Sequence, residues 1–145
     1  EKEKNQKNNI VSLLNLIKKR YSKKNIYFKN NKKINISVRP NSIKRCINNL
    51  LSNSLKFSKN IEITCSRKNT YVEIIIDDDG PGIPKKERSN VLQPFYRVES
   101  SRNRGTGGIG LGITIATDII NNHGGNFFLE KSPLDGLRTR IYLPI

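Results

Sequence analysis

The spacing of apolar residues along the chain changes several times between a helical and a strand-like period. Apolar residues three or four positions apart lie on one face of a helix, and this spacing occurs over residues 10–17, 42–57 and 110–122. Apolar residues at every second position favour strands. They predict strands over residues 26–28, 34–38, 61–66, 71–77, 126–131 and 138–143.

The order of these segments indicates the fold class. Residues 26–28 and 34–38 are separated by a polar turn, and residues 61–66 and 71–77 form an antiparallel pair joined by 67–70. Pro40 closes the second strand, and Asn41 or Ser42 begins the following helix. The pattern predicts an α+β fold, a two-layer sandwich of a mixed, mostly antiparallel sheet with helices on one face. A chain of 145 residues has room for one such domain.

Charge and composition restrict the classes of partner. The net charge of +15 is concentrated in residues 1–60, which carry 16 basic and 2 acidic groups. The chain is rich in asparagine and isoleucine, whose codons, like those of lysine, are rich in A and T, so genome composition explains the basic residues more simply than a phosphate-binding surface does. Two cysteines give no disulfide framework, and the absence of methionine predicts a piece of a longer protein.

Asn49, Asn53 and Lys56 form a first candidate group on the helix over residues 42–57. The spacing of four and then three residues places these side chains on one helix face. Carboxamide oxygens are ligands suited to Mg²⁺, and a lysine ammonium suits phosphate. In a chain with so many asparagines, a solvated pair is the competing interpretation.

The run DDDGPGIP over residues 77–84 forms a second group, directly after an apolar strand. The plain interpretation is a turn, for which Asp, Gly and Pro are the usual residues. Three adjacent carboxylates are costly to hold together unless they meet donors. Asp78, Gly80 and Gly82 therefore fit a pocket in which a carboxylate accepts from an exocyclic amine and glycines let a flat ring approach the backbone.

The glycine-rich run over residues 104–116 forms a third group. Residues 105–110 match G-x-G-x-x-G, but no strand precedes them, so a dinucleotide-binding fingerprint is rejected. A glycine loop that leads into a helix N-terminus remains, where free amides can hold phosphate. Residues 79–108 otherwise contain only a short helical turn near residues 85–92, which is typical of a functional or mobile segment.

The three groups together resemble the ATP-binding domain of sensor histidine kinases, in the wider Bergerat-type family shared with gyrase, Hsp90 and MutL. NNLLSNSLKF (48–57) resembles the N box, DDDGPGI (77–83) the G1 box, QPFYR (93–97) the F box and GGIGLGI (107–113) the G2 box. The resemblance covers residues 34–145. Residues 39–53 and 91–102 further resemble the osmolarity sensor kinases that control porins.

The resemblance implies a role for each matching residue. Asn53 would ligate Mg²⁺ with Asn49 in support, Lys56 would meet phosphate, and Phe57 would pack on the adenine. Asp78 would accept from the adenine amine. The remaining implied ATP contacts are Gly80, Gly82, Ile83, Phe95, Arg97, Arg102, Arg104, Gly108, Gly110, Leu111 and Gly112.

Some positions depart from the family pattern. Leu92 stands where a first F-box phenylalanine is common, and Leu137 stands where many members have threonine. Hydrolysing relatives carry a glutamate at the position of Asn49, and an amide cannot act as a general base, so phosphoryl transfer is favoured over hydrolysis. His123 is the only histidine, at a helix end where a capping role is favoured over a role as phosphoacceptor.

The resemblance also implies domain organisation and partners. A single kinase domain would comprise an N-terminal helix and first strand (1–33), a nucleotide-binding core (34–145) and a mobile ATP lid (84–109). ATP, Mg²⁺, a dimerisation and phosphoacceptor domain of the same protein and a response regulator would be its partners, without nucleic acid. The chain would be a monomer and the whole protein a homodimer, with this part on the cytoplasmic side of a bacterial inner membrane. A serine kinase of the anti-sigma type and a basic nucleic-acid-binding module remain alternatives.

Overall fold

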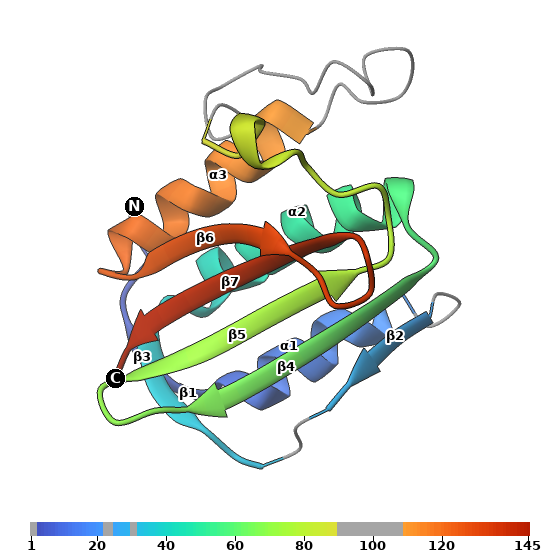
Figure 1. Cartoon of the computed structure of the whole chain (residues 1–145). Helices are drawn as coiled ribbons and strands as arrows, with labels where there is room; N and C mark the ends of the chain where they lie inside the picture. The colour runs from blue at the N-terminus through green and yellow to red at the C-terminus, as the bar shows by residue number, and fades with distance from the viewer. Residues whose placement is uncertain (1–2, 22–24, 30–31, 90–108) are drawn as a thin grey trace.

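A computed structural model of the chain describes residues 3–21, 25–29, 32–89 and 109–145, with the backbone alone at residues 109–111. Strands β2 (Asn25–Phe28), β4 (Asn60–Arg67), β5 (Tyr71–Asp78), β7 (Leu137–Pro144) and β6 (Asn126–Lys131) form a five-stranded sheet in that order. Helices α1 (Ile10–Lys19), α2 (Pro40–Phe57) and α3 (Ile109–Asn122) lie on one face of it (Figure 1). The predicted α+β class, a mostly antiparallel sheet with helices on one face, is confirmed.

The core lies between the sheet and the helices because the apolar residues of each element point the same way. On β4, Ile61, Ile63 and Cys65 are fully buried, and the residues between them are more exposed. On α2, Ile43, Ile47 and Leu51 form the buried stripe that the helical spacing predicts. Each strand and helix thus buries the face that its sequence period defines.

The pairing of the first strands differs from the prediction. β2 pairs in parallel with β4 rather than with its neighbour in sequence. β3 (Asn35–Val38) pairs antiparallel with β1 (Gln6–Asn9), a strand that the sequence analysis missed, and the two form a separate sheet. β1 has the sequence QKNN, which contains no apolar residue, so it gives no strand signal of its own.

The start of α2 also differs from the prediction. Pro40 does not close the preceding strand as a separate stop; it is the first residue of the helix, and Arg39 is the N-cap. Proline suits this position, since its missing N–H would have no partner there in any case. Arg39 makes no side-chain cap, and the Glu3 carboxylate takes that place by accepting from the amides of Asn41 (2.8 Å) and Ser42 (3.0 Å).

The other predicted elements agree within one or two residues at each end. The helical turn near residues 85–92 is a 3₁₀ turn over Lys85–Glu87, and residues 90–92 lie outside the described residues. None of the helices in the described ranges has the length and hydropathy that crossing a bilayer requires.

Candidate functional site

The candidate site lies where four segments meet at one end of the sandwich. These are the end of α2, the end of β5, the turn between β6 and β7, and the first turns of α3 (Figure 1). The sequence predicts candidate residues on three of these segments. The fourth, the β6–β7 turn over residues 132–136, was not recognised.

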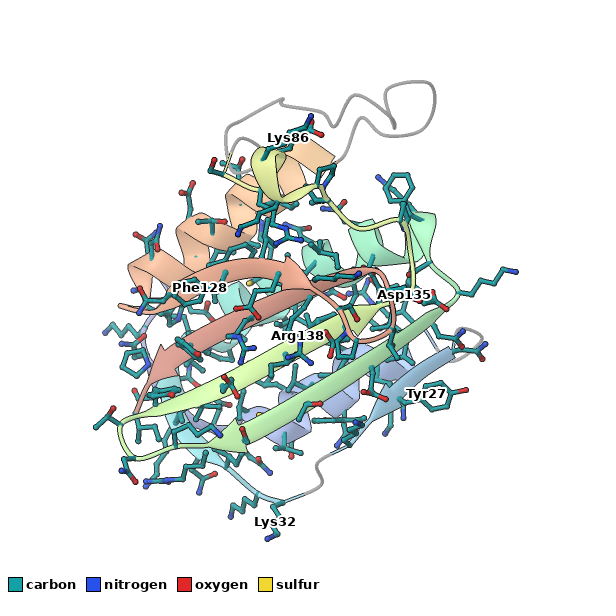
Figure 2. All side chains as sticks on the ribbon, viewed as in Figure 1. Tyr27, Lys32, Lys86, Phe128, Asp135 and Arg138 are labelled. Carbon is teal, nitrogen blue, oxygen red and sulfur yellow. The ribbon has the colours of Figure 1, made fainter. Side chains whose placement is uncertain are left out.

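The three consecutive aspartates point in different directions because strand side chains alternate between the faces of a sheet. Asp77 faces away from the helices and accepts two hydrogen bonds from the Arg138 guanidinium, at 2.8 and 2.9 Å. Figure 2 shows Arg138 in the middle of this outer face. Asp79 accepts from the backbone at the start of β4. Only Asp78 points to the helix side, where a ligand can be held between the layers.

Asp78 is 5% exposed and is held by backbone donors. Its Oδ1 accepts from the amides of Gly80 (3.0 Å) and Leu137 (2.9 Å), and its carbonyl oxygen accepts from the Gly136 amide (3.1 Å). Burial raises the pKa of the Asp78 carboxyl, and the nearby Asp79 charge raises it further. The hydrogen bonds from Leu137, Gly80 and the Ser54 side chain lower the pKa but do not cancel this rise. Asp78 is therefore a fixed, partly desolvated acceptor.

Glycines make this arrangement of Asp78 possible. A Cβ at Gly136 would collide with the Asp78 carboxylate and carbonyl oxygens and would lie 2.6 Å from the Gly80 nitrogen. A Cβ at Gly80 would lie 2.9 Å from the Phe57 carbonyl oxygen. Gly82 has a φ of 72°, in the left-handed region that favours glycine. The backbone therefore packs tightly around Asp78 because these positions carry no side chain.

On α2, the predicted residues lie along the helix as their spacing requires. Asn49, Asn53 and Phe57 are half-buried and Lys56 is exposed. The Nδ2 atom of Asn53 is buried and has no hydrogen-bond partner within the part of the chain that the structure describes. A Cβ at Gly112 on α3 would lie 2.6 Å from this atom, so the amide and the glycine are in close contact. An unpaired buried amide is unusual in a folded protein, which makes Asn53 a candidate ligand-binding group.

These residues fit Mg²⁺ and a nucleotide. The Asn53 amide can turn by 180°, which brings Oδ1, a Mg²⁺-type ligand, to the position of the unpaired nitrogen. Asn53 and Asn49 would hold the metal, and Lys56 would lie in reach of phosphate. Asp78 offers a fixed acceptor to an amine of the base. Ile83 packs with Ile113 in a small apolar cluster, and its contact with a ligand remains a prediction.

Several predicted site residues are not placed by the structure. The predicted lid over residues 84–109 lies largely in the range 90–108, which the structure does not describe. Phe95, Arg97, Arg102, Arg104 and Gly108 lie outside the described residues. Gly110 and Leu111 belong to the first turn of α3, and only their backbone is described.

His123 lies at the opposite end of α3 and is engaged on both ring nitrogens. Nε2 accepts from the Arg39 amide (3.1 Å), so Nδ1 carries the proton and donates to the Ile119 carbonyl (2.8 Å). The Arg39 guanidinium also donates to the Asn122 carbonyl (3.0 Å). His123 therefore caps α3 and joins it to the start of α2.

The sequence analysis did not single out Gly136 or Asp79 as site residues. A signal for Gly136 was present, since Asp135–Gly136 is a turn dipeptide between two predicted strands. The partner of Asp79 was not visible, because Asn60 lies 19 residues away in sequence.

A sheet covered on one face by three helices is the fold of the ATP-binding domains of histidine kinases. The ATP-binding domain of PrrB from Mycobacterium tuberculosis has the same fold, with a TM-score of 0.81 and 24% identity over 97% of this chain and 96% of that one. The histidine kinase domain of the Escherichia coli osmosensor EnvZ superposes with a TM-score of 0.74 and 27% identity, over 100% of this chain and 91% of that one.

The sequence comparisons identify the family. The family described as "Histidine kinase-, DNA gyrase B-, and HSP90-like ATPase" matches residues 38–145, and the chain belongs to it. The sensor histidine kinase CpxA of Escherichia coli is 38% identical over 107 residues, which are 73% of this chain and 23% of CpxA. The sensor histidine kinase GtrS of Pseudomonas aeruginosa is 37% identical over 106 residues, 73% of this chain and 22% of GtrS. The chain thus spans less than a quarter of the length of these relatives.

Proposed function

We propose that the chain is the catalytic ATP-binding domain of a two-component sensor histidine kinase. It binds Mg-ATP and presents the γ-phosphate to a histidine on a separate dimerisation and phosphoacceptor domain, for relay to a response regulator. The observation that carries the proposal is the buried Asp78 carboxylate, held by two backbone amides at the same end of the fold as the unpaired Asn53 amide. Membership of the family and the similarity to named sensor histidine kinases support it.

Each residue then has a defined task. Asp78 accepts from the exocyclic amine of adenine, Gly80 and Gly82 let the base approach, and Phe57 packs against it. Asn53, with Asn49, holds Mg²⁺, and Lys56 meets the phosphates. Bound Mg²⁺ supplies positive charge that neutralises the phosphate oxygens. The work of the chain is to position the nucleotide, which is most of what phosphoryl transfer requires.

Two features support transfer to another domain over hydrolysis. Asn49 is an amide at the position where hydrolysing relatives carry a glutamate, so no general base for water is present there. Both nitrogens of His123 are used within the fold, 2.8 and 3.1 Å from their partners, so this ring does not suit an acceptor role. The acceptor histidine is then expected on a separate domain.

The finer assignments form part of the same proposal. The whole protein is a homodimer anchored in a bacterial inner membrane, with this domain in the cytoplasm and monomeric in isolation. The chain acts without nucleic acid. The likeness to EnvZ supports an osmosensing branch, although CpxA and GtrS are similar to most of the chain as well.

Nucleotide binding is tested with a fluorescent ATP analogue and Mg²⁺. ADP should displace the analogue, while DNA and GTP should not, because guanine presents a carbonyl oxygen to Asp78 where adenine presents an amine. Asp78→Ala should weaken binding about ten- to a hundredfold, since the lost bond involves a charged group. Asp135→Asn, which removes an exposed carboxylate from the neighbouring turn, is the control. Equal affinity for GTP and ATP, or displacement by DNA, would contradict the proposal.

Phosphoryl transfer is tested by adding a separately made dimeric helical-hairpin domain that carries the acceptor histidine. Phosphohistidine should form, Asn53→Ala should abolish it, and ATPase activity of the chain alone should stay near background. Asn49→Glu should raise ATPase activity, because it supplies a base for water. Strong ATPase activity of the unmodified chain would favour a hydrolysing relative, and phosphorylation of a serine would favour the anti-sigma type of kinase.

A further inference from the structure

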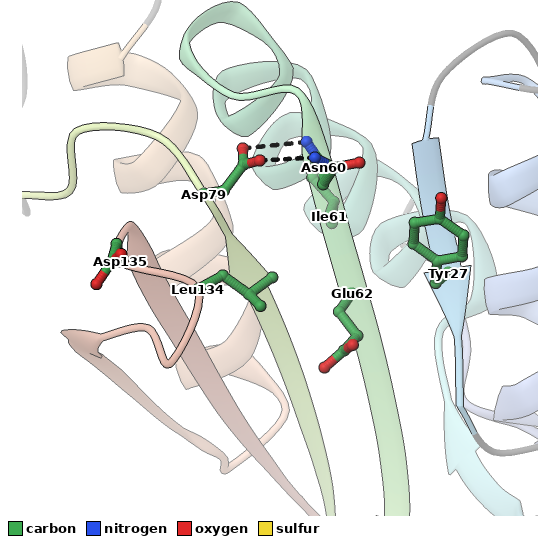
Figure 3. Close-up of a pocket in the computed structure, with 7 residues that line it drawn as sticks. All are labelled: Tyr27, Asn60, Ile61, Glu62, Asp79, Leu134 and Asp135. Atoms are coloured by element: carbon green, nitrogen blue, oxygen red, sulfur yellow. Dashed lines mark hydrogen bonds between the residues drawn. The ribbon is translucent and has the colours of Figure 1, made fainter.

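Asp79 forms a three-bond clasp with the start of β4. Its Oδ1 accepts from the amides of Lys59 (2.8 Å) and Asn60 (3.0 Å), and its Oδ2 accepts from the Asn60 side-chain amide (2.8 Å). Figure 3 shows the two carboxylate oxygens facing Asn60. The Asp79 amide also donates to the Asn60 carbonyl (3.3 Å). Both oxygens of one side chain are therefore used to join the end of β5 to the beginning of β4.

The segments that this clasp joins carry different parts of the candidate site. Lys59 and Asn60 follow within three residues of Phe57, the last residue of α2. The turn after β5 and the segment after α2 are in close contact, since a Cβ at Gly80 would lie 2.9 Å from the Phe57 carbonyl oxygen. On one side of the clasp stands Asp78, and on the other stands the end of α2 with Asn53 and Lys56.

We propose that Asp79 is a positioning residue that sets the separation between the base-binding and the phosphate-binding part of the site. The inference rests on the proposed function. Adenosine meets only Asp78 and Phe57, next to the clasp, whereas a nucleoside triphosphate must also reach Asn53 and Lys56 along α2 and therefore depends more strongly on this separation. Fixing two contact regions before binding saves the cost of ordering them on binding.

An aspartate is suited to this task because the clasp needs two acceptor atoms for three donors. Asparagine has one acceptor and would place its amide against that of Asn60. The same bonds lower the pKa of the Asp79 carboxyl, and the backbone amide of Asn60 has the largest effect. The clasp is therefore complete at neutral pH.

The test compares adenosine with Mg-ATP as competitors of the fluorescent ATP analogue. In Asp79→Ala, the affinity for Mg-ATP should fall roughly tenfold while that for adenosine stays within about twofold. Asn60→Asp should have a similar or larger effect on Mg-ATP, because it places a second carboxylate against Asp79. The double variant Asp79→Asn/Asn60→Asp restores donor against acceptor and should regain most of the affinity for Mg-ATP.

Asp79 and Asp135 both line a pocket of about 290 Å³ (Figure 3). Asp135→Asn is the matched control, since Asp135 takes no part in the clasp. Its φ of 78° is one that asparagine tolerates. Equal losses for adenosine and Mg-ATP, no loss in Asp79→Ala, or no recovery in the double variant would overturn the positioning role. Failure of the unmodified chain to bind either ligand would instead overturn the proposed function, so the two failures are distinct. Thermal unfolding of each variant identifies any that do not fold, and the double variant then decides the matter.

Discussion

The two ends of the α2–α3 pair are built on opposite principles. At the start of α2, Glu3 caps the helix, and Arg39 and His123 satisfy one another and the last carbonyls of α3. At the other end, Asn53 leaves a buried amide nitrogen without a partner in the described chain, and Gly112 lies against it. The polar groups of the first end serve the fold, and we propose that those of the second end bind a ligand. One unpaired amide among the described residues thus distinguishes the proposed binding site from the structural joint in the same pair of helices.

The charged groups show the same difference. Burial raises the pKa of Asp78 at the candidate site, despite its hydrogen bonds. For Glu3, burial alone would raise the pKa, but the bonds from Asn41 and Ser42, together with the charge of Arg39, outweigh it and lower the pKa. Asp78, at the candidate site, therefore resists ionisation, whereas Glu3, at the start of α2, ionises more readily than a free carboxyl group.

The largest expected effect comes from Gly136→Ala. The new Cβ would collide with Asp78, so the β6–β7 turn has to move and Asp78 loses two backbone donors. We expect a loss of about 2–3 kcal/mol in the free energy of unfolding and loss of detectable ATP binding. Chemical denaturation and analogue binding measure the two effects. Pro133→Ala, on the same turn, is the control, and normal ATP affinity in Gly136→Ala would contradict the role of this glycine.

As the pH is lowered, the loss of ATP affinity at Asp78 should precede the loss of stability at Glu3. Because the pKa of Asp78 is raised in the folded chain, Asp78 takes up a proton above the ordinary value of 3.8, and ATP affinity should fall in this window by up to about ten- to a hundredfold. Protonation of Asp78 in this window favours the ligand-free folded state, so it causes no unfolding. The pKa of Glu3 is lowered, so its contribution to stability is present above the ordinary value and is lost only as the pH falls through the lower, folded value.

Binding and unfolding curves measured from neutral pH down through the acid unfolding transition test this order of events. Asp78→Asn should remove the acid-dependent part of the change in affinity. ATP affinity that stays constant down to the pH of unfolding would contradict the assignment of Asp78.

Gly112→Ala should act through Asn53 and have a smaller effect. Its Cβ would displace the Asn53 amide, so the part of ATP affinity that depends on Mg²⁺ should fall roughly tenfold, as in Asn53→Ala. Binding of ADP in the presence of a chelator should change little. Asp118→Ala, on the exposed side of α3, is the control, and an unchanged Mg²⁺ dependence in Gly112→Ala would show that the contact has no role in metal binding.

His123→Ala should have the smallest effect, confined to the fold. It removes the acceptor for the Arg39 amide and the donor to Ile119, which we expect to cost about 1 kcal/mol of unfolding free energy. ATP affinity should stay unchanged, because the candidate site lies at the other end of α3. A large change in affinity without a loss of stability would show that the two ends are coupled.

The sequence alone determined most of the elements and the central motifs of the site. Helices α2 and α3 and strands β4 to β7 were predicted within one or two residues, because the period of apolar side chains is a local property of the chain. The choice of Asp78, made from its spacing to Gly80 and Gly82 and from family resemblance, agrees with its direction in the structure. Asn53 was found from its spacing on a helix and from family resemblance.

Only the tertiary structure decided which segments meet. The parallel pairing of β2 with β4, the strand β1, the capping of α2 by Glu3 and the clasp of Asp79 with Asn60 join residues from 19 to 39 positions apart in sequence. No local period encodes such partners, because the partner is chosen by which buried faces and unpaired amides the whole fold brings together. The sequence therefore determined what each segment is, and packing determined which of its polar groups hold the fold and which we propose to bind a ligand.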